Sequence, residues 1–313
     1  FEVLRMAFAD LRLDDEPFVR AKRELSVGIA AEDKQPRTIA TRTMNQVLIP
    51  DHPYTRYPTQ DSLGAASADE VRQLMRQLMT KDRLLVVVVG DISAEELAPR
   101  LDQVFGALPQ TSVLPVVPEA VARPAPVEPV VKVLEQPQTL VMFSGPGVKR
   151  EDPDFYAAYL LNYILGGGGL SSRLSDELRE KRGLTYGVAT GFSVQPHFSR
   201  WTGSSSTTNQ TASQTMRLIR ENIDRLGQAG PTQQEMEDAK AYVTGAFPLA
   251  FDSNAKIARN LMGFRQDGLD VDYVEERNSH FEAVTLDDLK RVAAEYRRAE
   301  NFSFVMVGQP RLD

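Results

Sequence analysis

Cysteine is absent from the 313 residues, and histidine and tryptophan are scarce, with three and one residues. The lack of thiols excludes disulfides and thiolate metal sites, but it does not identify the compartment, because a cysteine-free chain is stable in oxidising and reducing surroundings alike. Basic residues are outnumbered, and the formal net charge of −7 argues against a nucleic-acid-binding face. Long hydrophobic runs are also missing, since stretches such as Leu84–Val89 have the length of a strand and not of a membrane span.

What the chain does contain is an internal repeat at an offset of 218 residues. Residues 67–90 align without a gap with residues 285–308, so that the capped helix start, the hydrophobic run and the closing glycine all coincide. Farther upstream, Lys22 falls on Lys240 at the same offset. A match of this length at one offset indicates a duplicated domain.

The offset also predicts where each copy begins. If the second copy starts near Val130, the first starts roughly ninety residues before Phe1, and we expect the first copy to be incomplete at its front. Residues 108–129 hold six prolines, which favour an extended linker over helix or sheet. We therefore expect residues 1–107 to be the C-terminal part of the first domain and residues 130–313 to be a complete second domain.

The predicted elements mix helices and strands without regular βαβ alternation. This pattern predicts an α+β fold, in which helices pack on a mixed, largely antiparallel sheet in each of two homologous halves. The expected helices lie at about 2–12, 15–33, 36–48, 67–80, 93–106, 211–228, 232–246 and 286–298, with a further helix starting at Asp152-Pro153. The expected strands lie at about 83–90, 130–134, 139–144, 185–195, 199–207 and 302–307.

Residues 165–186, LGGGGLSSRLSDELREKRGLTY, carry the sharpest signal in the chain. The four glycines allow positive φ angles and close backbone approach, and Gly183 is suited to end a helix in the left-handed conformation. Three leucines spaced four apart, Leu170, Leu174 and Leu178, predict the inner face of that helix. Taken alone, the segment is a tight helix connection, because it lacks the pattern of a phosphate-binding loop.

The order of these residues resembles the C-terminal half of the insulinase-type (M16, pitrilysin and processing-peptidase) zinc metallopeptidases, and more narrowly the bacterial M16B members. The resemblance extends to DKQP at 33–36, HPYTRYPTQDSL at 52–63 and VVVVGDI at 86–92. It implies that Arg179 and Tyr186, seven residues apart, reach the active site of a neighbouring half. A fixed guanidinium and a phenol hydroxyl can stabilise the charge that develops on a carbonyl oxygen when water attacks a peptide bond.

The zinc site of that family is not found in this chain. The family uses an HxxEH helix and a later glutamate, whereas His52, His197 and His280 are far apart and lie outside any such motif. The position of the later glutamate falls on Gly28 or Ile29, and neither side chain can bind zinc. The neighbouring Glu24 and Glu32 are not convincing replacements, so we expect no metal ligand in this chain.

These departures favour a non-catalytic subunit of an M16B-type zinc metalloendopeptidase, which is expected to be inactive alone and to supply Arg179 and Tyr186 in trans.

 

The expected partners are a homologous, zinc-bearing HxxEH subunit, which would form a heterodimer with this chain, and peptide substrates. Zinc would then sit in the partner or in a segment absent from this chain. One alternative is a fragment of a complete M16B zinc peptidase whose HxxEH segment is absent. A second alternative is a non-proteolytic structural scaffold with the M16 fold. We expect a bacterial protein, in the periplasm rather than in the cytoplasm.

Overall fold

The computed structural model describes residues 1–9 and 12–312, and the chain forms two compact units. Each unit is assembled from three separate stretches of the sequence. Unit 1 consists of Phe1–Glu32, Tyr57–Val116 and Pro248–Tyr273, and unit 2 consists of Asp33–Arg56, Val117–Phe247 and Val274–Asp313. The predicted division into homologous domains at residues 107 and 130 stays a prediction, because these units are defined by contacts and not by homology.

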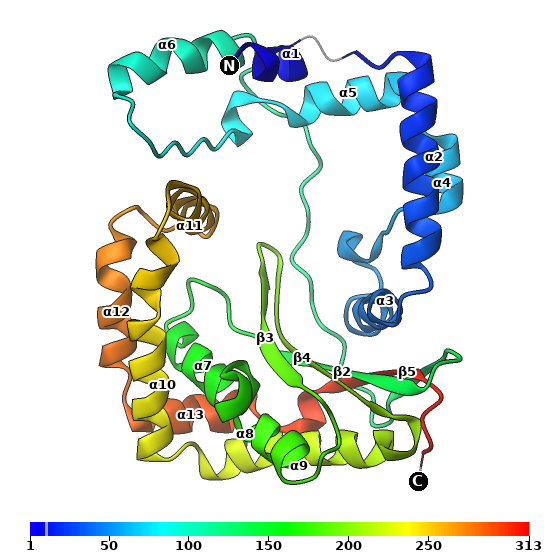
Figure 1. The fold of residues 1–313 in the computed structure, drawn as a ribbon, viewed down its shortest axis with the longest axis vertical. Helices are drawn as coiled ribbons and strands as arrows, with labels where there is room; N and C mark the ends of the chain where they lie inside the picture. The colour runs from blue at the N-terminus through cyan, green and yellow to red at the C-terminus, as the bar shows by residue number, and fades with distance from the viewer. Residues whose placement is uncertain (10–11, 313) are drawn as a thin grey trace. The chain divides into compact units, whose positions relative to one another are not determined.

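Unit 2 is built on a five-stranded sheet with the strand order β1-β5-β2-β4-β3 (Figure 1). Its strands are β1 (Val130–Val133), β2 (Gln138–Pro146), β3 (Val188–Gln195), β4 (Phe198–Thr208) and β5 (Ser303–Gly308). Only β1 and β5 pair in parallel among the described strands, and the other three pairings are antiparallel. The α+β class and the largely antiparallel sheet that the sequence predicts are therefore confirmed.

Helices cover both faces of this sheet. On one face, Val141 and Phe143 of β2 pack in a large core with α7 (Phe155–Asn162), α9 (Ala212–Ala229) and α13 (Leu286–Tyr296). On the other face, Leu140 and Met142 pack against α3 (Pro36–Leu48). Because β5 lies in the interior of the sheet and is covered on both faces, all six of its residues are buried.

The remaining helices complete the two units. They are α1 (Glu2–Ala9), α2 (Asp15–Glu32), α4 (Gln60–Ala65), α5 (Ala68–Leu78), α6 (Ala94–Phe105), α8 (Arg173–Ser175), α10 (Gln233–Gly245), α11 (Asn254–Gln266) and α12 (Tyr273–Ala283). Among the described residues, none of the helices is both long and apolar enough to cross a membrane.

The repeat of the sequence is also a repeat of hydrogen bonds. In α2, Lys22 Nζ donates to the carbonyl oxygens of Gly64 (2.8 Å) and Ala66 (2.7 Å). In α10, Lys240 Nζ donates to the carbonyl oxygens of the residues at the same offset, Glu282 (2.9 Å) and Val284. The helices that come next after these carbonyl groups along the chain, α5 and α13, both begin with a capping box. The two halves thus repeat in local structure as well as in sequence.

The strand predicted at 83–90 is wrong. Leu84–Val89 forms no strand, and its side chains are partly exposed, to 36% at Leu84 and 45% at Val88. The equivalent residues of the second copy form β5, which is held between β1 and β2. A run of leucine and valine indicates that a segment can be buried, but a strand also needs partners, and no described strand pairs with this run.

Most other predicted elements are confirmed within a few residues. The helix expected at 36–48 has these bounds as α3, and the strand expected at 199–207 becomes β4. The helix expected to start at Asp152-Pro153 begins later, at Phe155, with Asp154 as its N-cap residue. Trp201 of β4 is fully buried.

Candidate functional site

The loop that carries Arg179 and Tyr186 is shaped by two π-helical turns, Tyr163–Gly167 and Asp176–Glu180. Single turns of this kind are frequent at functional sites. The second turn is closed by Gly183, whose φ of +62° lets its N–H group reach the carbonyl oxygen of Arg179 at 2.9 Å. The predicted left-handed stop at Gly183 is therefore confirmed.

The glycine run packs closely against its neighbours. A Cβ atom on Gly166 would lie 2.7 Å from Thr190 Cγ2, so the backbone approaches β3 as only glycine can. Leu174 and Leu178 are buried behind the loop, as predicted. The prediction is wrong for Leu170, which is 61% exposed, because a short 3₁₀ turn and not a regular helix carries it.

Arg179 and Tyr186 are both open to solvent. Tyr186 is 89% exposed, and its hydroxyl makes no hydrogen bond within the described chain. The side chain of Arg179 is 41% exposed, and its Nε lies 3.5 Å from Glu180 Oε1. No hydrogen bond joins the two side chains among the described residues, so the fold presents them as separate donors on one loop.

Neighbouring charges on the loop neutralise one another. The buried carboxylate of Glu177 pairs with Arg182 at 2.5 Å, and Lys181 Nζ lies 2.6 Å from Asp176 Oδ2. The hydrogen bond from Lys181 to Asp176 raises the pKa of the lysine. These pairs leave Arg179 as the cation of the loop with the longest ion-pair distance to its nearest carboxylate.

A groove of about 320 Å³ lies beside Tyr186 in unit 2. Its polar walls come from Arg37 on α3, Gln138 on β2 and Ser204 and Ser206 on β4. Arg37 Nη2 donates to Ser204 Oγ at 3.3 Å across a sequence separation of 167 residues. Sequence reasoning missed Arg37, because no local pattern connects α3 with a strand so distant in the chain.

The described residues do not form a site that fits a zinc ion. His52 is buried and bonds the carbonyl oxygen of Pro118, His197 contacts Glu119, and His280 stacks on Tyr156. No group of three histidine, cysteine, aspartate or glutamate side chains that could hold a metal exists among the described residues.

The position that the family resemblance assigns to the later glutamate also holds no side chain that can bind a metal. Gly28 has open space around it, and Ile29 is buried in α2. Both Glu24 and Glu32 are exposed on the same helix, and neither belongs to a group that could hold a metal.

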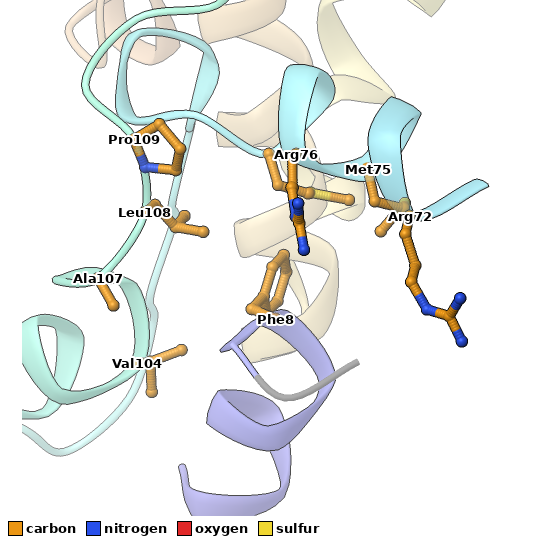
Figure 2. A pocket seen from close by; sticks show the side chains of 9 residues that line it. Phe8, Arg72, Met75, Arg76, Val104, Ala107, Leu108 and Pro109 are labelled. Atoms are coloured by element: carbon orange, nitrogen blue, oxygen red, sulfur yellow. The ribbon is translucent and has the colours of Figure 1, made fainter. Parts of the chain in front are cut away.

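A second cavity, of about 310 Å³, lies in unit 1 between α1, α5 and the end of α6 (Figure 2). Phe8 points into it from α1, facing Met75 and Leu108. The guanidinium of Arg72 is already held by Asp69 and by the carbonyl oxygen of Leu13. The lining contains no carboxylate, histidine or hydroxyl, so it offers neither a nucleophile nor a general base.

Comparison with known families gives one match that spans more than half of the chain. The family model of the peptidase M16 inactive domain matches residues 65–243. A solved structure with the same description, from Pseudomonas fluorescens, superimposes with a TM-score of 0.86 at 26% identity and covers 96% of this chain and 71% of that one.

Two curated relatives from bacteria are similar to this chain over most of its length. The non-peptidase homolog YmxG of Helicobacter pylori is 22% identical over 301 residues, which are 94% of this chain and 68% of the relative. The uncharacterised zinc protease YmxG of Bacillus subtilis is 25% identical over 265 residues, which are 83% of this chain and 63% of the relative. The chain spans between 52% and 68% of the length of the first three curated relatives it matches.

Proposed function

The chain belongs to the family of the peptidase M16 inactive domain, and from this membership we propose that it is a non-catalytic subunit of an M16B-type zinc metalloendopeptidase. The observation that carries the proposal is the exposed pair Arg179 and Tyr186, on a chain whose described residues hold no metal-binding group. A homologous partner with an HxxEH motif would bind zinc and hydrolyse the peptide.

The chemistry of the pair is electrostatic. As water attacks the scissile carbonyl, negative charge develops on its oxygen, and donors that are already in place stabilise that charge without reorganising. The guanidinium of Arg179 supplies a permanent positive charge, and the free hydroxyl of Tyr186 supplies one hydrogen bond. Neither group needs to transfer a proton, so both can act from a subunit that holds no zinc.

The names of relatives support both the zinc-bearing partner and the non-catalytic role of this chain. Several relatives are named zinc proteases, whereas the Helicobacter pylori relative is named a non-peptidase homolog. A family with members of both kinds suits a division of labour between a zinc-bearing and a donor-bearing subunit. The bacterial origin of these relatives supports a bacterial source, and we propose a periplasmic rather than a cytoplasmic location for the complex.

Two other functions remain as alternatives, and each predicts a different outcome. A fragment of a complete M16B peptidase would recover zinc binding and activity once the longer protein is made. A non-proteolytic scaffold would need neither an exposed phenol nor an exposed guanidinium, and the exposure of Tyr186 and Arg179 favours the peptidase subunit.

The proposal is tested by expressing the chain together with a zinc-bearing M16B partner. We expect Arg179→Ala and Tyr186→Phe each to lower kcat/KM for a quenched fluorescent peptide by about 100- to 1,000-fold, as removal of an oxyanion donor does elsewhere. Arg225→Ala and Tyr242→Phe, two exposed residues outside the loop, are matched controls. Unchanged kcat/KM in both loop variants would refute the catalytic role.

A further inference from the structure

Strand β3 is an outer strand of the sheet in unit 2, with β4 as its one neighbour in the strand order (Figure 1). Half of its backbone N–H and C=O groups therefore point away from the sheet. Such an edge can accept an extended peptide as an additional strand, with backbone hydrogen bonds giving affinity and side-chain contacts giving specificity.

The sheet surface next to this edge is shallow on the side that faces α3. Ala189 of β3 lies opposite Ser204 of β4, which in turn lies opposite Met142 of β2 in the core under α3. Gly187 precedes β3 and lines the same groove. These small residues leave room for a side chain of an added strand to lie across β3 toward α3.

Arg37 is the one charged side chain that lines this groove within the described chain. Arg37 donates a hydrogen bond to the neutral hydroxyl of Ser204, and no carboxylate pairs with its guanidinium among the described residues. A guanidinium has five N–H donors, so most of them remain free for a ligand. An added strand would lie about 10 Å from β4, at two strand spacings, and the side chains of arginine and glutamate together span such a gap.

We propose that the edge of β3 and the groove beside Tyr186 bind an extended peptide whose carboxylate pairs with Arg37. The inference rests on the proposed function, because the groove shares Tyr186 with the catalytic loop and would hold the same peptide substrates. Arg37 then determines specificity by favouring an acidic residue near the scissile bond. The complementary charge of a carboxylate, and the lack of any other charge in the lining, favour this occupant over a second copy of the chain.

The proposal is tested by peptide binding to this chain alone, measured by fluorescence anisotropy. The probes are decapeptides without other charges that carry one central glutamate or one central glutamine, each with an amidated C-terminus. We expect the glutamate peptide to bind about fivefold to tenfold more tightly, as one partly exposed charge pair allows. A glutamine peptide with a free C-terminal carboxylate tells whether a terminal carboxylate serves as well as a side chain.

Variants locate the preference at Arg37. Arg37→Ala should abolish the preference for glutamate, Arg37→Lys should retain part of it, and Arg225→Ala on α9 should retain all of it. A glutamate peptide with alternate backbone nitrogens methylated should lose binding, because it cannot pair with β3. Equal affinity of the two peptides, an unchanged preference in Arg37→Ala, or a dimer through β3 that excludes peptide would overturn the proposal.

The two proposals fail in distinguishable ways. Tyr186→Phe keeps the ring beside the groove and should leave peptide affinity within twofold, while it removes the hydroxyl that the proposed function assigns to catalysis. A glutamate preference that depends on Arg37, together with unchanged catalysis in the loop variants, would refute the proposed function and leave the binding site standing. Loss of catalysis without any glutamate preference would do the reverse.

Discussion

At the scale of single residues, the guanidinium of Arg297 is the most unusual group in the core. It is 1% exposed, its carbon Cζ lies 3.5 Å from the centroid of the Trp201 ring, and its Nε has no hydrogen-bond partner among the described residues. Burial lowers its pKa to about 9. At the equivalent position of the first copy, the chain carries Met79. The charge at Arg297 is thus costly, and the repeat itself points to an apolar substitute.

We expect Arg297→Met to raise the free energy of unfolding by about 1–2 kcal/mol at pH 7, because the burial cost of the charge exceeds the cation–π attraction. Between pH 9 and the higher pKa of the unfolded state, the unfolded chain binds more protons than the folded one. The wild type should therefore gain stability as the pH rises above 9, and the advantage of the variant should shrink.

Urea unfolding of both proteins at pH 7 and pH 10.5 measures this difference, and Arg225→Met, at an exposed position, is the control. A variant that is less stable than the wild type at pH 7, or a difference that does not change with pH, would contradict the expected cost of burial.

At the scale of elements, the same sequence pattern has two outcomes in this chain. Val88 in the first copy is 45% exposed in a segment without strand pairing, whereas its equivalent, Met306, is fully buried in β5. The capped helices that precede both segments and the short 3₁₀ turns between them are alike. Local sequence thus specified the helix and the turn, and the presence of neighbouring strands decided the rest.

A matched pair of substitutions tests this difference. Met306→Thr should lower the free energy of unfolding by about 2–4 kcal/mol, since it removes apolar volume and buries a hydroxyl in the core between the sheet and its helices. Val88→Thr should change it by less than about 0.5 kcal/mol, as surface substitutions usually do. Thermal unfolding followed by circular dichroism measures both. Equal losses in the two variants would mean that residues 84–89 are packed as tightly as β5.

At the scale of the whole molecule, each compact unit takes a helix from the other copy of the repeat. Helix α3, from the first copy, belongs to unit 2 and covers its sheet, while α11, at the same position of the second copy, belongs to unit 1. This exchange brings Arg37 to the groove beside Tyr186. A linear division of the sequence into domains does not contain that information.

The chain should bind no zinc, because its described residues hold no group that could bind a metal and the expected glutamate position falls on Gly28 or Ile29. We expect less than about 0.1 zinc per chain by plasma mass spectrometry after dialysis, and no shift in melting temperature when zinc is added. Gly28→Glu should not restore binding, since one carboxylate without histidines cannot complete a tetrahedral site. One tightly bound zinc per wild-type chain would contradict the division of labour between subunits.

The sequence by itself determined the α+β class, the repeat, most helix bounds and the spacing of Arg179 and Tyr186, because caps, periodicity and glycines act within a few residues of the chain. Only the tertiary structure decided that Leu84–Val89 is not a strand, that Leu170 is exposed and that Arg37 lies beside Ser204. Strand pairing and burial depend on partners far along the chain, and a local pattern cannot show whether such partners are in place.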